Sequence, residues 1–316
     1  MIDAVLQACA ARFRNLRRGT ARGTHERAPH KPVLLLAVLD EFAEGSITEN
    51  RIGMTPALVA RFRDVWSRYV TSLHFRPDFA LPFYHLQGEG WWHLHMRPGH
   101  AVLLTASHSP KSFRRLSDAV LYAALDEPLY ALLQNPTTRE ALRAILLETC
   151  FGSVAAPPGP GYIHTVESQM LHEAPTDYQQ QARDFNDEEQ VARSGVSKRL
   201  IPRIYRHTCC ISGMRIAAGN GVQMVDACHI IPWAETQDDT ISNGLSLCPN
   251  LHRAFDRGLI RIDADYRVVV SPDVAEAESA YGIKGFAGKR ILLPEAREFW
   301  PGVENLEWHW GRWGIE

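Results

Sequence analysis

The chain has 316 residues and a formal net charge of −2, and 45% of its residues are hydrophobic. This length allows two domains with separate cores, and the charge excludes a polycation that binds nucleic acid through net charge alone. No apolar run approaches the roughly 18 residues of a membrane-spanning helix, and the N-terminus lacks a signal peptide's long apolar core. We therefore expect a cytoplasmic globular protein with no membrane partner.

The N-terminal segment predicts an amphipathic helix with a basic end. The helix covers IDAVLQACAARFRNL, and Arg17 and Arg18 follow it in a basic stretch that contains glycines. Such a stretch can lie along a phosphate backbone, because Lys and Arg there release counterions. The same cations also suit a solvated helix end, where they interact with the helix dipole. Both interpretations stay open.

Two further helices are expected before residue 74. The run VLLLAVL is too short to span a membrane and predicts a buried helix that starts near Pro32 and stops at Gly45. The stretch SITENRIGMTPALVARFRDVWSRYV predicts a short strand or turn and then a second helix, where apolar side chains recur at helical spacing from Leu58 to Val70.

Residues 74–104 are dense in aromatic residues, prolines and histidines. The turn GEG predicts a hairpin between FYHL and WWHLH. Pro82 and Tyr84, with Arg76 nearby, would suit an apolar pocket that recognises an altered nucleotide by shape. Composition by itself favours the simpler interpretation, in which these rings fill a core.

The words APHKPVLLLAVLDEF and LPFYHLQGEGWW resemble the sulfur-binding domain of phosphorothioate-dependent type IV restriction endonucleases. The resemblance covers about residues 1–150. It implies that His30 and Lys31 reach the DNA backbone at the modified step and that Pro82 contacts the sulfur. Leu81 departs from the family, which often has an aromatic residue before this proline.

The same resemblance implies a further pocket loop, for which TASHSPK offers Ser107 and His108. Such a pocket is physically coherent. Sulfur is larger, softer and less strongly hydrated than the phosphate oxygen it replaces, so an apolar cradle accepts it while an oxygen there would lose its hydration. Basic neighbours would then hold the remaining charge.

Helices are expected over residues 111–150, in the segments SFRRLSDAVLYAALD, EPLYALLQN and PTTREALRAILLETCF. VAAPPGPG then indicates a linker. We expect a DNA-modification-binding domain at residues 1–152, a linker at residues 153–196 and a catalytic domain at residues 197–316. The linker should end in a basic helix that leads into the last domain.

Three polar residues stand out in the stretch DACHIIPWAETQDDTISNGLSLCPNLHRAFD: His229, Asn243 and His252. The surrounding pattern predicts a strand, a polar loop, a second strand and a short helix opened by Pro249. Phosphodiester cleavage needs a base for water, which a neutral histidine supplies, and a divalent cation that holds the phosphate. His229 suits the base, Asn243 can hold the histidine or the loop, and His252 with Asp226 can hold the metal.

The order and spacing of these residues, with the words ACHIIPW and SNGLSLCPNLHRAFDRGL, resemble the HNH endonuclease family and its ββα-metal fold. The resemblance covers about residues 200–270. It implies His229 as general base, Asn243 as the central asparagine, and His252 as a ligand of Mg²⁺, Mn²⁺ or a similar ion. Cys228 stands where many members carry a ligand Asp, and Asp226 follows the pattern of a subset.

The six cysteines form no C-x-x-C pair, so we expect neither a disulfide framework nor a structural Zn²⁺ site. They suit small buried hydrophobic residues instead. After the predicted helix, GLIRIDADYRVVVS indicates a hairpin, and we expect the C-terminal tryptophans to pack on the domain.

The fold class predicted is α+β in two domains: a mostly helical N-terminal domain with a small β-hairpin or sheet, and a C-terminal ββα-metal domain. The function predicted is a modification-dependent endonuclease whose partner is double-stranded DNA that carries phosphorothioates. A homodimer is the simplest route to a double-strand break, because one HNH site cuts one strand. The alternatives are an HNH nuclease for methylated or specific-sequence DNA, and a non-catalytic DNA-binding regulator built on the HNH scaffold.

Overall fold

The computed structural model describes residues 2–99, 112–152, 159–172, 185–218, 222–279 and 281–313. The chain divides into two compact units. We call Met1–Thr165 with Asn186–Gly195 the N-terminal unit, and Val166–Phe185 with Val196–Glu316 the C-terminal unit. The α+β class is confirmed, because helices predominate and the strands of the described residues pair in small antiparallel sheets.

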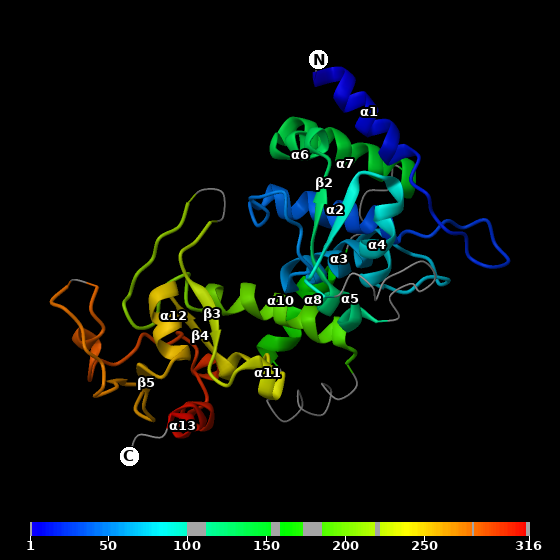
Figure 1. The fold of residues 1–316 in the computed structure, drawn as a ribbon. Coiled ribbons are helices and arrows are strands. Elements are labelled where there is room, and N and C mark those ends of the chain that lie inside the picture. Colours follow the sequence, from blue (N-terminus) through cyan, green and yellow to red (C-terminus); the bar gives the residue numbers. More distant parts are fainter. Residues whose placement is uncertain are drawn as a thin grey trace. The chain divides into compact units, whose positions relative to one another are not determined.

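Helices make up most of the N-terminal unit. In chain order they are α1 (Ile2–Arg14), α2 (His30–Ala43), α3 (Pro56–Tyr69), α4 (Ala80–His85), the 3₁₀ helix η1 (Leu86–Glu89), α5 (Phe113–Ala119), α6 (Glu127–Gln134) and α7 (Pro136–Phe151). The expected core helix is confirmed as α2, whose residues 33–39 are all buried. Helices α3, α4 and α7 pack against it (Figure 1), so its aliphatic side chains form the centre of the core.

The hairpin expected around GEG is wrong. LPFYH belongs to α4, and the segment continues as η1 until Gly90, which has a left-handed φ of 80°. Phe79, Phe83 and Leu86 are all buried, at the helical spacing of four and three residues, so the aromatic side chains pack one face of a helix. The helical spacing of the buried side chains therefore decides the structure of this segment, although its glycines are typical of a hairpin turn.

The strand β1 (Trp92–Met96) pairs instead with β2 (Val120–Leu125), antiparallel and with Trp92 opposite Leu125. This corrects the expectation of a continuous helix through AVLYAAL, because α5 ends at Ala119. The rings of His95 and Tyr122 stack across the pair at 4.5 Å. Cross-strand contacts of this kind stabilise a sheet that no local signal in the sequence indicated.

The core of the C-terminal unit has the expected ββα order. The strand β3 (Asp226–His229) pairs antiparallel with β4 (Gly244–Leu247), with His229 opposite Gly244. Between them lie α11 (Trp233–Thr236) and the 3₁₀ helix η3 (Ile241–Asn243), and α12 (Pro249–Asp256) follows. Helix α12 packs on both strands (Figure 1). Leu251, Ala254 and Phe255 bury its apolar face.

Further elements surround this core. The expected hairpin is confirmed as β5 (Ile260–Ile262) with β6 (Val268–Val270), and η4 (Lys284–Phe286), η5 (Arg297–Phe299) and α13 (Val303–Arg312) follow. Helix α13 packs on β5, and the ring of Trp310 lies 4.4 Å from the guanidinium of the buried Arg261. Trp300 donates to the carbonyl oxygen of Pro294 at 2.9 Å. Trp300 and Trp310 therefore pack on the unit as expected.

Two helices supply residues to both units: α8 (Tyr162–His172) and α10 (Asp187–Ile204). Helix α8 and the first part of α10 fall in the predicted linker, and α10 continues beyond its end at residue 196. Residues 153–158 and 173–184 of this segment fall outside the described residues. In the C-terminal unit, a Cβ at Gly244 would lie 2.5 Å from Ile201 Cδ1, so glycine permits the close packing of β4 on α10. Among the helices described, none is long and apolar enough to cross a membrane.

Candidate functional site

His229 lies at the end of β3, and its ring is fixed by a carboxylate. Its Nε2 lies 3.0 Å from Oδ1 of Asp239, and the other oxygen of Asp239 accepts a hydrogen bond from Trp233 Nε1 at 3.0 Å. Asp239 is fully buried, whereas the His229 side chain is partly exposed. A proton assigned to Nε2 satisfies the carboxylate and leaves Nδ1 with a lone pair that can take a proton.

Asn243 is fully buried and holds the loop between the two strands. Its Oδ1 accepts from the backbone N–H of Ile231 at 2.8 Å, and its Nδ2 donates to the carbonyl oxygens of Ile231 and Asp238 at 3.1 and 2.9 Å. These bonds fix the segment that carries Trp233 and Asp239. The contacts therefore give Asn243 a positioning role, and its direct part in catalysis stays a prediction.

His252 lies on α12 between two carboxylates. Its Nδ1 is 3.7 Å from Asp226 Oδ2, and its Nε2 is 3.5 Å from Asp256 Oδ2. Cys228 completes a group with His252 and Asp256, in which one donor atom from each lies within 4.8 Å of the others. Burial raises the pKa of the Cys228 thiol, and the carboxylate of Asp256 raises it further.

These residues fit a divalent ion, because imidazole and carboxylate donors meet at a partly exposed place. An imidazole binds an ion through one nitrogen, while a carboxylate that does not touch the ion often accepts a hydrogen bond from the other nitrogen. Nε2 of His252 faces Asp256, so the arrangement favours Asp256 as a ligand and Asp226 as the residue that orients the ring. The assignment of Asp226 as a ligand stays a prediction.

Sequence reasoning missed Asp239 and Asp256. Asp256 follows His252 by four positions, which places both on one face of α12, so the helical spacing could have found it. Asp239 had no such signal, because it lies in a polar loop and reaches His229 only through the fold of that loop.

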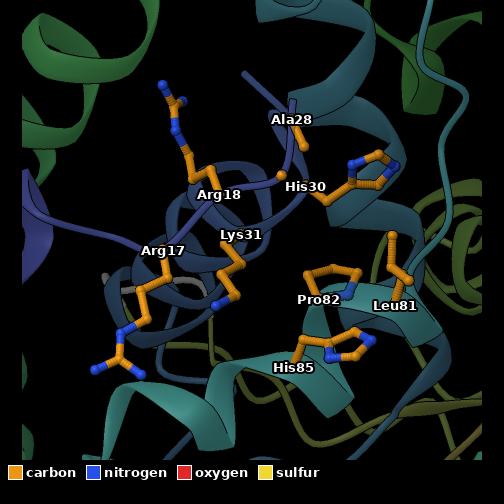
Figure 2. A pocket seen from close by; sticks show the side chains of 9 residues that line it. Arg17, Arg18, Ala28, His30, Lys31, Leu81, Pro82 and His85 are labelled. Carbon is orange, nitrogen blue, oxygen red and sulfur yellow. The ribbon is translucent and has the colours of Figure 1, made fainter. Parts of the chain in front are cut away.

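A second site is a pocket of about 330 Å³ in the N-terminal unit. Figure 2 shows Leu81, Pro82 and His85 on α4 opposite His30 and Lys31 at the start of α2. The predicted residues that meet at this pocket are Arg17, Arg18, His30, Lys31 and Pro82, and the lining residues that the prediction did not name as site residues are Gly19, Ala28, Leu81 and His85. Tyr84 and Arg76 do not line it, and Ser107 and His108 lie outside the described residues.

His30 is held tightly at the pocket wall. Its Nε2–H donates to the carbonyl oxygen of Arg76 at 2.9 Å, and its ring lies 4.8 Å from that of Trp66. Burial lowers the pKa of His30, against the smaller opposite effect of this hydrogen bond. Its Nδ1 is buried and has no hydrogen-bond partner among the described residues. Burial, then the charge of Lys31, lower the pKa of His85.

A buried carboxylate organises the cations of the pocket. Oε1 of Glu89 lies 2.5 Å from the ammonium of Lys31 and accepts from the backbone N–H of Arg17 at 3.1 Å. Arg17 Nη1 also donates to the carbonyl oxygen of Gly88 at 3.3 Å. The apolar surface of Leu81 and Pro82 therefore lies beside cations held in fixed places, which suits a ligand with one apolar and one anionic side.

Two family models match the regions of the chain that carry the two sites. Residues 209–263 match the HNH endonuclease family, and residues 7–158 match the ScoMcrA-like DNA sulfur-binding domain. A search of curated proteins gave no match. Among solved structures, the modification dependent TagI restriction endonuclease aligns at 22% identity over 37% of this chain and 36% of that chain, with a TM-score of 0.28. The chain therefore carries a region that matches a ScoMcrA-like DNA sulfur-binding domain, followed by a region that matches an HNH endonuclease domain.

Proposed function

We propose that the protein is a modification-dependent restriction endonuclease that binds phosphorothioate-modified double-stranded DNA and hydrolyses its phosphodiester bonds. The observation that carries the proposal is the pair formed by His229 and the buried Asp239 at 3.0 Å, in the same ββα core as His252 and Asp256. The bond to Asp239 uses Nε2 and leaves Nδ1 of His229 able to take a proton. A general base needs such a nitrogen. A non-catalytic scaffold would not require this arrangement.

In the proposed hydrolysis, Nδ1 of His229 takes the proton of the attacking water. The carboxylate of Asp239 then stabilises the imidazolium and keeps its orientation, as the third member of a catalytic triad does. His252 and Asp256 would hold a divalent ion such as Mg²⁺ or Mn²⁺, which supplies charge stabilisation at the phosphate. Asn243 keeps the loop of Asp239 in place throughout.

Recognition is assigned to the pocket of the N-terminal unit. Pro82 and Leu81 offer sulfur an apolar surface, and an oxygen at the same place would lose water without gaining a hydrogen bond. Arg17, Arg18 and Lys31 lie around it and would hold the neighbouring charge of the backbone. We assign recognition to residues 1–152, the connection to residues 153–196 and cleavage to residues 197–316.

The test is cleavage of two plasmids of one sequence, one with phosphorothioates and one without, in Mg²⁺, Mn²⁺ or Co²⁺. We expect the modified plasmid to be cut and the plain plasmid to stay intact, with cutting lost in His229→Ala while binding persists. Equal cutting of both plasmids would remove the sulfur specificity and leave a nuclease for methylated or specific-sequence DNA. Tight binding without cutting under all conditions would leave a DNA-binding regulator.

The proposal also includes a homodimer, because one HNH site cuts one strand. Sedimentation of the protein with modified DNA is expected to give two copies per double-strand break site. A single copy that makes the same break would contradict this part.

A further inference from the structure

Cys228 places a sulfur atom at the proposed ion site. It stands in β3 directly before His229, and β3 packs against α12, which carries His252 and Asp256. The Sγ of Cys228 lies 3.9 Å from Asp256 Oδ1, and the three donor atoms of Cys228, His252 and Asp256 are mutually within 4.8 Å. Sulfur, nitrogen and oxygen donors therefore face one point.

The exposure of the three side chains gives this point a floor and an opening. Cys228 is only 1% exposed, whereas the side chains of His252 and Asp256 are 27% and 57% exposed. An ion can therefore enter from the side of Asp256 and meet the thiol at the bottom. The thiol therefore faces the ion site and not bulk water.

The donor types decide which ion fits. Mg²⁺ takes oxygen ligands in near-ideal octahedral geometry and keeps several waters. Thiolate and imidazole together select borderline and soft ions, among which Zn²⁺ and Co²⁺ bind nitrogen and sulfur well. A site with Asp in place of Cys228 would lack this preference.

We propose that Cys228 is a ligand of the divalent ion, together with His252 and Asp256, and that the site therefore prefers a thiophilic ion such as Zn²⁺ or Co²⁺ to Mg²⁺. The inference rests on the proposed function only for the use of this site by a divalent ion. On binding, the Cys228 thiol passes its proton to water and the thiolate binds the ion, because a coordinating thiol is deprotonated.

The test is a titration of the metal-free, full-length protein with Co²⁺, followed by absorption. Sulfur bound to Co²⁺ gives a charge-transfer band in the near ultraviolet. We expect this band in the wild type and its loss in Cys228→Ser. The matched control is Cys248→Ser, because Cys248 and Cys209 form another thiol pair, linked by a hydrogen bond, in the same unit; the control should keep the band.

Two results would overturn the inference: a wild type without the band, or a band that Cys228→Ser keeps and Cys248→Ser loses. The second result would place the ion at Cys209 and Cys248. Cys228→Asp is a further variant that replaces sulfur by oxygen. Its preference for Co²⁺ over Mg²⁺, measured by competition, should fall at least about tenfold, since even residues that only hydrogen-bond to a ligand change metal affinity by roughly 10–100-fold.

If the serine variant does not fold, the wild type still decides. Zn²⁺ should displace bound Co²⁺ at equal concentration, and a large excess of Mg²⁺ should leave the band unchanged; displacement by Mg²⁺ as easily as by Zn²⁺ contradicts the inference. The absorption test does not depend on DNA cleavage. A Cys228-dependent band in a protein that cuts no DNA would contradict the proposed nuclease function and support Cys228 as a ligand. DNA cleavage by a protein that gives no band would support the nuclease function and contradict Cys228 as a ligand.

Discussion

In the proposed mechanism, His229 depends on Asp239, which lies between the motif's histidine and asparagine but is not one of the motif's characteristic residues. Asp239 holds Nε2 of the ring, and Trp233 and the loop fixed by Asn243 hold Asp239 in turn. The sequence motif predicts the histidine, because its spacing to Asn243 and His252 is specific. It does not predict the carboxylate, because a loop residue reaches its partner only through the three-dimensional path of the loop.

Asp239→Asn tests this role. The amide keeps the size of the side chain but no longer requires the proton of His229 at Nε2, so the base is found less often in its active form. We expect kcat for cleavage of modified DNA to fall about 100-fold, within the roughly 10²–10⁴-fold that general-base catalysis contributes. DNA binding should not change. A variant with the rate of the wild type would remove Asp239 from the account.

The matched control is Glu235→Gln. Glu235 lies on α11 in the same loop and pairs with Arg312, away from His229. Its variant should cut at the rate of the wild type. A loss equal to that of Asp239→Asn would show that any charge change in the loop suffices.

His30 predicts a pH dependence of DNA binding. Burial lowers its pKa in the free protein, so the ring is neutral near pH 7. A phosphate beside it favours the protonated ring and raises that pKa, so binding takes up a proton. Affinity should therefore rise as the pH falls from about 8 to about 5.5, by at most about tenfold per pH unit. The ring is also surrounded by Lys31, His85 and Asp78. These groups set the part of the pH dependence of DNA affinity that does not come from His30.

Binding of a modified duplex, measured by fluorescence anisotropy across this range, checks the prediction. The slope should flatten in His30→Gln and persist in His74→Gln, because His74 is exposed and lies outside the pocket. An unchanged slope in His30→Gln would contradict the assignment of the proton to His30.

At the scale of elements, the sequence predicts what local spacing and one-face burial determine. It predicts α2 and the ββα core, because their apolar runs and polar residues recur at fixed intervals. It does not predict that FYHL is helical or that VLYAAL is a strand. The strand that pairs with β1 follows residues 100–111 in the sequence, so no local pattern indicates the pairing. The choice between a helix and a hairpin at FYHL depends on how Phe79 and Phe83 pack in the core.

Helix α4, which carries Pro82, is held at its start by a buried carboxylate. Glu188 Oε2 accepts from the backbone N–H of Phe79, the N-cap residue of α4, at 2.8 Å, and Arg63 lies 3.5 Å from the other oxygen. Burial nevertheless raises the pKa of Glu188 to about 7, from an ordinary value of 4.5. The N-terminus of α4 therefore meets a carboxyl group whose charge changes near neutral pH.

The sign of the effect on stability follows. The native state binds the proton of Glu188 more tightly than the unfolded chain, so this contribution is complete below the unfolded pKa and is lost as the pH rises through about 7. The melting temperature of the wild type should fall from about pH 5 to about pH 8 more than that of Glu188→Gln. Circular dichroism at several pH values measures it.

Glu189→Gln is the control, because Glu189 also lies near Arg63, at 3.8 Å, but is more exposed than Glu188. It should follow the wild type across the pH range. Equal pH dependence in wild type and Glu188→Gln would show that Glu188 does not titrate between the two states in this range.

For the whole molecule, the proposed function assigns choice of DNA and cleavage to different units. The net charge of −2 gives no general attraction to DNA, so we assign binding to the pocket where Arg17, Arg18 and Lys31 gather around an apolar surface. Variants of the pocket should therefore change which DNA is bound, and variants of His229 should change only whether bound DNA is cut.

The most direct measurement compares the affinity of the protein for three duplexes that differ at one phosphate. One duplex has an ordinary phosphate there, and the other two have a phosphorothioate in one or the other configuration at phosphorus. A chiral pocket that holds the sulfur against Pro82 must bind one sulfur stereoisomer more tightly than the other two duplexes. Pro82→Ala should reduce this preference about tenfold, as expected when part of an apolar contact is lost, and Pro77→Ala, which lies outside the pocket, should not. Equal affinity of the wild type for all three duplexes would contradict the account.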